Sequence, residues 1–338
     1  MLSKNRVIKS SLLLIFTALI FTGCGGSSSA AAPAAKPTPK VLPAWISAPL
    51  PSDNDQFMYG MSVESDRESA IKAALSDMIA KLGTTIESTY ESNEEVRGVF
   101  VNSNIKNQIK SGVSKVKINN YRVIKSHKVS YREFAVMIET DKQKLVKGMK
   151  ENLEAQKKII SQKYADLKGR DALTRYNTKK ELSGSATKLL SEILIIAELD
   201  KTFNKKENLD FITKKQKEFL AESKSLKFFV SGNEKSAKFA DSIKNYLAQS
   251  GFNVTNSKKK AVHVKVNTTD RVSGKIAVLT LNVSVFDKAQ RIGGKSVIVK
   301  ERFNGSMASA YKNASIHLEQ DIKSQGINEV IGINLKLD

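Results

Sequence analysis

The amino-terminal stretch, which ends at Cys24, most limits what this chain can fold into. Basic residues among the first nine precede an apolar run over residues 12–21, and small residues follow that run. A basic start, a short apolar core and small residues at its end are the parts of a secretory signal. The run is too short to cross a bilayer as a finished helix, which needs roughly 20 apolar residues. We therefore expect residues 1–23 to be a signal peptide that takes no part in the fold.

Cys24 is the only cysteine of the chain, and it directly follows Gly23. The stretch Leu19–Cys24 resembles the lipobox of bacterial lipoproteins, although Phe21 stands where leucine is more usual. The resemblance implies that the cysteine thiol is diacylated, that the signal is cut before it, and that the new amino terminus is acylated. We therefore expect Cys24 to be the lipidation site, with a plain secretory or uncleaved segment as the alternative. Two acyl chains are sufficient for stable anchoring to a membrane.

Residues 24–41 have the composition of a linker, because Gly, Ser, Ala and Pro dominate and apolar residues that could form a core are scarce. As a flexible coil, this lipidated linker spans about 20–25 Å. A single cysteine also excludes an intramolecular disulfide, so the folded part must be stabilised by packing alone.

The chain is strongly basic, with a formal net charge of +21 from 55 Lys and Arg and 34 Asp and Glu. Removal of the three basic residues of the signal leaves about +18, since 21 − 3 = 18. This excess of positive charge has two interpretations. Either it attracts the protein to an acidic surface, or the lysines only keep the protein surface well solvated. The lysines are scattered, and Lys258–Lys260 is the only run of three, which favours solvation.

Residues 42–148 have the pattern of an αβ sandwich domain with the order β-α-α-β-β. Alternating apolar residues predict strands over 56–63, 116–128 and 131–140. Ser65 and Glu68 have the spacing of a capping box, and an apolar stripe from Ala70 to Leu82 follows at helical spacing. A second helix within 93–112 is harder to place, and the single Trp45 is expected to fill the core at the domain edge.

Several residues of this domain match a family pattern of the form Pro-x-Trp-Ile, Tyr-Gly-Met and Asp-x-x-x-Ala-x-x-x-Ala. It resembles the LPP-twenty family of outer-membrane lipoproteins, whose domain also occurs in the flagellar lipoprotein FlgP. The resemblance covers roughly residues 42–148 and implies an outer-membrane lipoprotein and a fold, but no catalytic residues. The matching residues are Pro43, Trp45, Ile46, Tyr59, Gly60, Met61, Asp66, Ala70 and Ala74.

The rest of the chain divides by composition into two further parts, so we expect an α+β protein overall. Residues 149–225 have little glycine, no proline and apolar stripes, which predicts a central antiparallel helical segment interrupted near Gly169. Residues 226–338 predict a small two-layer α/β domain with four or five strands and two helices. One of these helices ends before Gly251 and the other near Gly326.

A search for chemistry along the sequence gives no catalytic, cofactor-binding or metal site. Residues 289–296 fit a relaxed phosphate-loop pattern, but a strand rather than a helix is expected to follow, which indicates a β-hairpin turn. His127, His263 and His317 are isolated and lack metal-ligand spacing. The adjacent pair Glu94 and Glu95 has no predicted partner and indicates a solvated turn. Basic residues are not clustered with aromatics, which argues against nucleic-acid binding.

We therefore expect a non-enzymatic lipoprotein of the bacterial outer membrane, at its periplasmic face or at the cell surface. Its partners would be the membrane, through the lipid on Cys24, and other envelope proteins or a second copy of the chain. No cofactor, metal, small-molecule substrate or nucleic acid is expected. A flagellar basal-body accessory lipoprotein and a binder of acidic envelope polymer or lipopolysaccharide are the alternatives.

Overall fold

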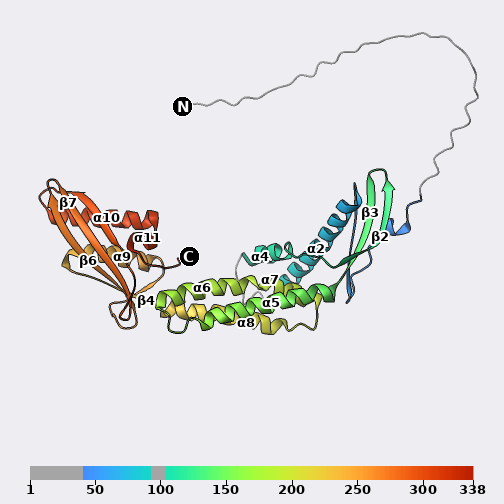
Figure 1. Cartoon of the computed structure of the whole chain (residues 1–338), viewed down its shortest axis with the longest axis horizontal. Coiled ribbons are helices and arrows are strands. Elements are labelled where there is room, and N and C mark those ends of the chain that lie inside the picture. The colour runs from blue at the N-terminus through green and yellow to red at the C-terminus, as the bar shows by residue number, and fades with distance from the viewer. Residues whose placement is uncertain (1–40, 93–103, 338) are drawn as a thin grey trace, which may run out of the picture. The chain divides into compact units, whose positions relative to one another are not determined.

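The computed structural model describes residues 41–92 and 104–337 (Figure 1). The chain from Pro43 onward belongs to one compact unit. Helices and mainly antiparallel sheets are mixed, which confirms the α+β class. The predicted lipidation site Cys24, the linker before residue 41 and the pair Glu94 and Glu95 lie outside the described residues. Among the helices of the described residues, none is both long enough and apolar enough to span a membrane.

The first elements follow the predicted order β-α-α-β-β. After the short helix α1, the chain forms a three-stranded antiparallel sheet in the order β1-β3-β2, against which α2 packs. The strands begin and end within a few residues of their predicted bounds, apart from β2, which starts later. The elements are α1 (Ala44–Ser47), β1 (Phe57–Glu64), α2 (Arg67–Ser92), α4 (Asn104–Val113), β2 (Tyr121–Ser130) and β3 (Glu133–Asp141).

Two local predictions in this region are wrong. The helix α2 is capped by Asp66 and not by Ser65, because the Asp66 carboxylate accepts hydrogen bonds from the Ser69 amide at 2.8 Å and from its hydroxyl at 2.7 Å. The expected core residue Trp45 is half-buried and belongs to neither buried cluster. Its ring centroid lies 6.0 Å from the Lys125 Nζ atom, so Trp45 packs under a cation at the surface instead.

Gly60 explains how closely α2 lies against the first sheet. A Cβ atom at this position would come within 2.3 Å of the Ala74 carbonyl oxygen and 2.9 Å of the Met78 Cγ atom. Glycine is therefore needed for the helix backbone to approach the strand, and the alanines of α2 serve the same close packing.

Four helices follow, and side-chain caps set the amino termini of three of them. Asp141, Asp171 and Asn204 each accept a hydrogen bond from an amide of the helix that they precede. Gly169, with φ +81°, stands in the turn between α5 and α6, where the interruption was predicted. The apolar stripe over residues 182–199 is divided between two helices that meet at Leu189. The helices are α5 (Lys142–Ala165), α6 (Ala172–Lys188), α7 (Leu190–Leu199) and α8 (Lys205–Ser225).

Residues 226–338 form more elements than predicted, because the short strands and short helices have too few residues to show a periodic pattern of apolar side chains. Its strands are β4 (Lys227–Gly232), β5 (Asn253–Val254), β6 (Val262–Ser273), β7 (Ile276–Asp287), β8 (Gln290–Gly293) and β9 (Ser296–Arg302). Its helices are η1 (Glu234–Ser236), α9 (Ala237–Gln249), α10 (Met307–Gln325) and α11 (Ile327–Ile331). Gly251, with φ +83°, and Gly326, with φ +86°, follow α9 and α10 as predicted.

The sheet of this part runs in the order β5-β4-β6-β7, and both β8 and β9 pair with the far side of β7. The parallel pairs are β4 with β5 and β4 with β6, and the other pairs are antiparallel. The phosphate-loop-like residues 289–296 contain β8 and the first residue of β9, so a strand and not a helix follows, as predicted. The stretch is not a single turn, because the turn between β7 and β8 includes only residue 289 of it.

Two buried clusters form the core of the described residues. The first joins the sheet β1–β3 to α2, α4, α5, α7, α8 and the end of α6, and the second joins the sheet β4–β9 to α9, α10 and α11. Leu173 and Tyr176 of α6 belong to the second cluster, where the Tyr176 ring lies 5.7 Å from that of Phe252. The predicted helical segment therefore has no buried core of its own, and its helices share the cores of the two sheets.

Candidate functional site

The three histidines occupy different parts of the fold, as their isolation in the sequence predicts. His127 lies on β2 opposite Ala135 of β3. His317 lies on α10, and its Nδ1 atom is 2.5 Å from the Glu301 carboxylate of β9. His263 lies on β6, and its Nε2 atom is 2.7 Å from the Ser231 hydroxyl of β4. Within the described ranges, no group of three or more His, Cys, Asp and Glu residues is placed to hold a metal ion.

His263 sits between two phenyl rings in a positive environment. Its ring centroid is 5.0 Å from that of Phe229 and 6.3 Å from that of Phe286. Burial lowers the pKa of His263, and the nearby cations Lys258 and Lys265 lower it further. The imidazole is therefore neutral near pH 7. Among the described residues, no carboxylate is hydrogen-bonded to it, so the pair with Ser231 lacks the third group that orients the histidine of a catalytic triad.

The sheet around His263 has one covered and one uncovered face. Successive residues of a strand point to opposite faces, and the residues that face α9 and α10 are the buried ones, such as Val264, Leu279 and Val299. We call the opposite side the outer face. Its residues include Thr269, Thr280 and the ring of His263.

Charges are separated across this sheet. All acidic residues of its strands β4 and β6–β9 lie on the covered side, and each has a partner there. Asp270 pairs with Lys235 at 2.5 Å, Glu301 pairs with His317, and Asp287 accepts a hydrogen bond from the Ala172 amide at 2.8 Å. The charged residues of these strands on the outer face are all cations, namely Lys227, Lys265, Arg271, Arg291, Lys300 and Arg302.

At one end of the outer face lies a hollow with a cavity volume of about 390 Å³. Its acidic residues are already engaged, because Glu222 pairs with Arg175 at 3.0 Å and with Lys179 at 2.7 Å. Its lysines have no ion pair among the described residues. We call it the lysine pocket, and the lysines that line it are Lys227, Lys258, Lys260 and Lys288.

The backbone at the lysine pocket is unusual. Lys260 and Lys288 both have φ +57°, and they are the only residues other than glycine with positive φ in the described part of the chain. A left-handed conformation costs a residue with a Cβ atom about 1–2 kcal/mol. Two such lysines at the rim of one hollow place their side chains around it, and the arrangement can attract phosphate or carboxylate groups.

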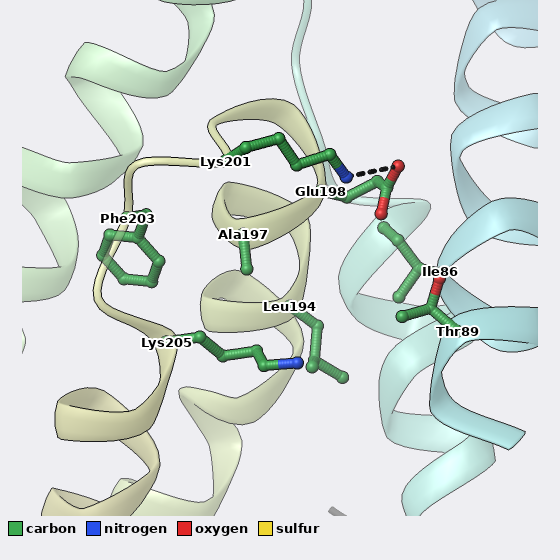
Figure 2. A pocket seen from close by; sticks show the side chains of 8 residues that line it. All are labelled: Ile86, Thr89, Leu194, Ala197, Glu198, Lys201, Phe203 and Lys205. Carbon is green, nitrogen blue, oxygen red and sulfur yellow. Dashed lines mark ion pairs between the residues drawn. The ribbon is translucent and has the colours of Figure 1, made fainter. Parts of the chain in front are cut away.

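A second hollow, with a cavity volume of about 280 Å³, lies between α2, α7 and the loop after α7 (Figure 2). Ile86 and Thr89 line it from α2, and Leu194 lines it from α7. Its ionic pair joins Lys201 and Glu198 at 3.1 Å, as the dashed line in Figure 2 shows. This hollow is mainly apolar and shows no cluster of groups suited to acid–base chemistry.

Neither the outer face nor the lysine pocket is evident from the sequence. The basic residues concerned are far apart in the sequence, from Lys227 to Arg302, and strand pairing brings them together. The only local signal is the run Lys258–Lys260, of which two residues line the pocket.

Comparisons with known proteins place the chain in no family. No family model matches it, and no curated protein matches it. Among solved structures, it is similar to the secreted protein HP1454 from the human pathogen Helicobacter pylori, with 11% identity, a TM-score of 0.39, and coverage of 80% of this chain and 98% of that one. It is also similar to a minor lipoprotein from Acinetobacter baumannii, with 16% identity, a TM-score of 0.23, and coverage of 29% and 93%. Likenesses at this level carry no argument about function.

Proposed function

We propose that the chain is a non-enzymatic lipoprotein of the bacterial outer membrane, held by lipid on Cys24, whose folded residues act as an envelope scaffold or protein-interaction module. The observation that carries the proposal is the stretch Leu19–Cys24, with its basic and apolar leader before it and a linker after it. A compact unit that begins at Pro43 agrees with a linker that ends near residue 41. In this proposal, residues 42–148, 149–225 and 226–338 are its three parts.

The substitution Cys24→Ala tests the anchor. We expect the full chain to label with a palmitate analogue and to sediment with membranes, and the variant to lose both the label and the sedimentation. Ser28→Ala, in the same linker, is the matched control and should change neither. Retention of the Cys24→Ala variant in the membrane fraction would show that an uncleaved leader, and not lipid, is the anchor.

A second candidate function is the binding of an acidic envelope polymer or lipopolysaccharide. The lysine pocket favours it, because lysines without ion pairs line a hollow whose carboxylates already have partners. The double substitution Lys258→Gln and Lys288→Gln should weaken binding to immobilised lipopolysaccharide, and added salt should weaken binding of the unchanged chain. Lys214→Gln with Lys217→Gln, on the exposed side of α8, removes the same charge as a control. Binding that does not respond to salt or to the pocket substitutions would rule this candidate out.

A flagellar basal-body accessory is the alternative that follows from the resemblance of residues 42–148 to the LPP-twenty family. The close approach of α2 to β1 gives a structural reason for two residues of that pattern, because a Cβ atom at Gly60 would meet the Ala74 carbonyl oxygen. Deletion of the gene should then remove periplasmic rings seen around the motor by electron cryotomography. Unchanged motor structure and unchanged motility on deletion would exclude the flagellar role.

A further inference from the structure

The β6–β7 hairpin, drawn in orange in Figure 1, ends in a patch that differs from the rest of the outer face. Its turn is Gly274–Lys275, with Gly274 at φ +59°, as a two-residue hairpin turn requires. The strand β9 runs beside β7 up to Arg302, so its last residues lie at the same end. We call this surface the hairpin-end patch, and it consists of Arg271, Lys275, Ile276, Ile298, Lys300 and Arg302.

The apolar residues of the patch are unusually exposed. Ile276 is 48% exposed and Ile298 is 62% exposed. On the outer face, Ile276 lies opposite Arg302, and Ile298 lies opposite Thr280. Their exposure is not explained by the core, since the buried residues of the same strands point to the other side. Exposed aliphatic side chains in a small surface patch can insert among the acyl chains of a lipid bilayer.

The cations of the patch flank these aliphatic residues. Arg271 of β6 and Lys300 of β9 both lie opposite Val278 of β7, one on each side of it. Among the described residues, none of the patch's cations has an ion-pair partner, and all of them are exposed. Two acidic residues, Asp270 and Glu301, directly adjoin these cations in the sequence. Both lie on the covered face, where Asp270 pairs with Lys235 and the buried Glu301 lies beside His317.

We propose that the hairpin-end patch docks on an anionic lipid bilayer, independently of the lipid on Cys24. Exposed aliphatic side chains among cations match a membrane interface, where the aliphatic groups enter the acyl boundary and the cations contact phosphates. A protein partner would need acidic side chains to neutralise the same cations. Neutralising them would not require the partner to cover the exposed side chains of Ile276 and Ile298. The patch therefore fits an anionic membrane better than an acidic protein or a soluble polyanion.

Vesicle flotation with residues 41–338 tests this proposal without the leader or Cys24. This part can be used alone because both buried clusters lie within it. We expect it to float with vesicles of phosphatidylcholine and phosphatidylglycerol, and not with vesicles of phosphatidylcholine alone. Binding should weaken with added salt, because the surface potential is screened. Absence of binding at low salt would overturn the proposal, whatever the outcome for the Cys24 anchor.

Substitutions separate the two contributions to binding. Lys300→Gln with Arg302→Gln should lower the partition coefficient on the order of tenfold or more, since each basic residue near an anionic surface contributes about fivefold. Ile276→Thr with Ile298→Thr should also lower it, while both residues keep a β-branched side chain. The matched controls are Lys214→Gln with Lys217→Gln for charge and the 56% exposed Ile159→Thr for apolar area. Circular dichroism of each variant checks that it is folded.

A fluorescent probe locates the contact. Because the single cysteine of the chain is Cys24, residues 41–338 can be labelled at one introduced cysteine. An environment-sensitive dye on Ser273→Cys should shift to the blue on anionic vesicles, and the same dye on Ser161→Cys of α5 should not. Equal binding of soluble polyphosphate and vesicles, with no loss for the isoleucine variants, would mean that the occupant is a polyanion and would refute membrane docking.

Discussion

Asp200, the residue that follows α7, provides a quantitative test of the electrostatics of the fold. Its carboxylate is only 9% exposed and forms an ion pair with Lys150 of α5. It also accepts hydrogen bonds from the Thr202 amide at 2.9 Å and from the Thr202 hydroxyl at 2.7 Å. The bond from Lys150 and those from Thr202 lower the pKa of Asp200 from 3.8 to about 2, although burial acts in the opposite direction.

The magnitude follows from linkage between proton binding and folding. Because the folded state lowers the pKa of Asp200, the unfolded chain binds the proton first as pH falls, and stability is lost on acidification. A fall from 3.8 to about 2 corresponds to about 2 kcal/mol of stability at pH 7. This contribution is complete well above pH 4, and about 1 kcal/mol of it remains at pH 3.

The substitution Asp200→Asn replaces the carboxylate by a neutral group of the same shape. Urea unfolding followed by circular dichroism should show a loss of about 2 kcal/mol at pH 7 and a smaller loss at pH 3. Asp210→Asn is the control, because the pair of Asp210 with Lys206 is exposed and should contribute little. A loss for Asp200→Asn that is the same at both pH values, or no greater than that for Asp210→Asn, would refute the argument.

Two further predictions concern packing and titration. Gly60→Ala should destabilise the fold by about 1–3 kcal/mol in urea unfolding, because its Cβ atom would meet the Ala74 carbonyl oxygen. Gly148→Ala, in open space on α5, should instead stabilise by about 0.5–1 kcal/mol, and a loss there would contradict this reasoning. The lowered pKa of His263 means that the unfolded chain gains its proton first, so stability should fall as pH drops below about 6.5. His263→Gln should therefore reduce the difference between the urea unfolding midpoints measured at pH 7.5 and 5.5. The same difference in the variant and the unchanged chain would contradict this prediction.

Much of the fold could be predicted because its long elements carry strong periodicity. The alternation of apolar residues from Ala277 to Val285 predicts β7. The stripe of apolar residues from Tyr311 to Ile322 predicts α10, and Gly326 marks its end. Elements with fewer than about five residues, such as β5 and β8, are too short for any period to show. They form because neighbouring strands are already in place.

The cap of α2 shows why boundaries are harder to predict. Ser65 and Asp66 are both good capping residues, and a capping box favours the pair Ser65 and Glu68. The structure selects Asp66, because its carboxylate binds both the amide and the hydroxyl of Ser69. Two local solutions of similar energy cannot be distinguished from residue types alone.

The candidate site could be predicted least, because it depends on which strands are neighbours. The sequence shows scattered lysines, and scattered lysines favour simple solvation. Pairing of β6 with β7 and of β7 with β9 puts Arg271 and Lys300 on either side of Val278. The basic surface therefore depends on which residues the register of the paired strands places side by side. It could be predicted only after the sheet was known.

The separation of charge across the second sheet has a physical consequence for function. Asp270 pairs with Lys235 and Glu301 lies beside His317, both on the covered face, so neither carboxylate lies among the cations of the outer face. Like charges on one surface repel each other, which lowers stability slightly and is screened by salt. An anionic partner removes this repulsion when it binds. Binding at the outer face should therefore raise the stability of the sheet β4–β9 more than that of the sheet β1–β3.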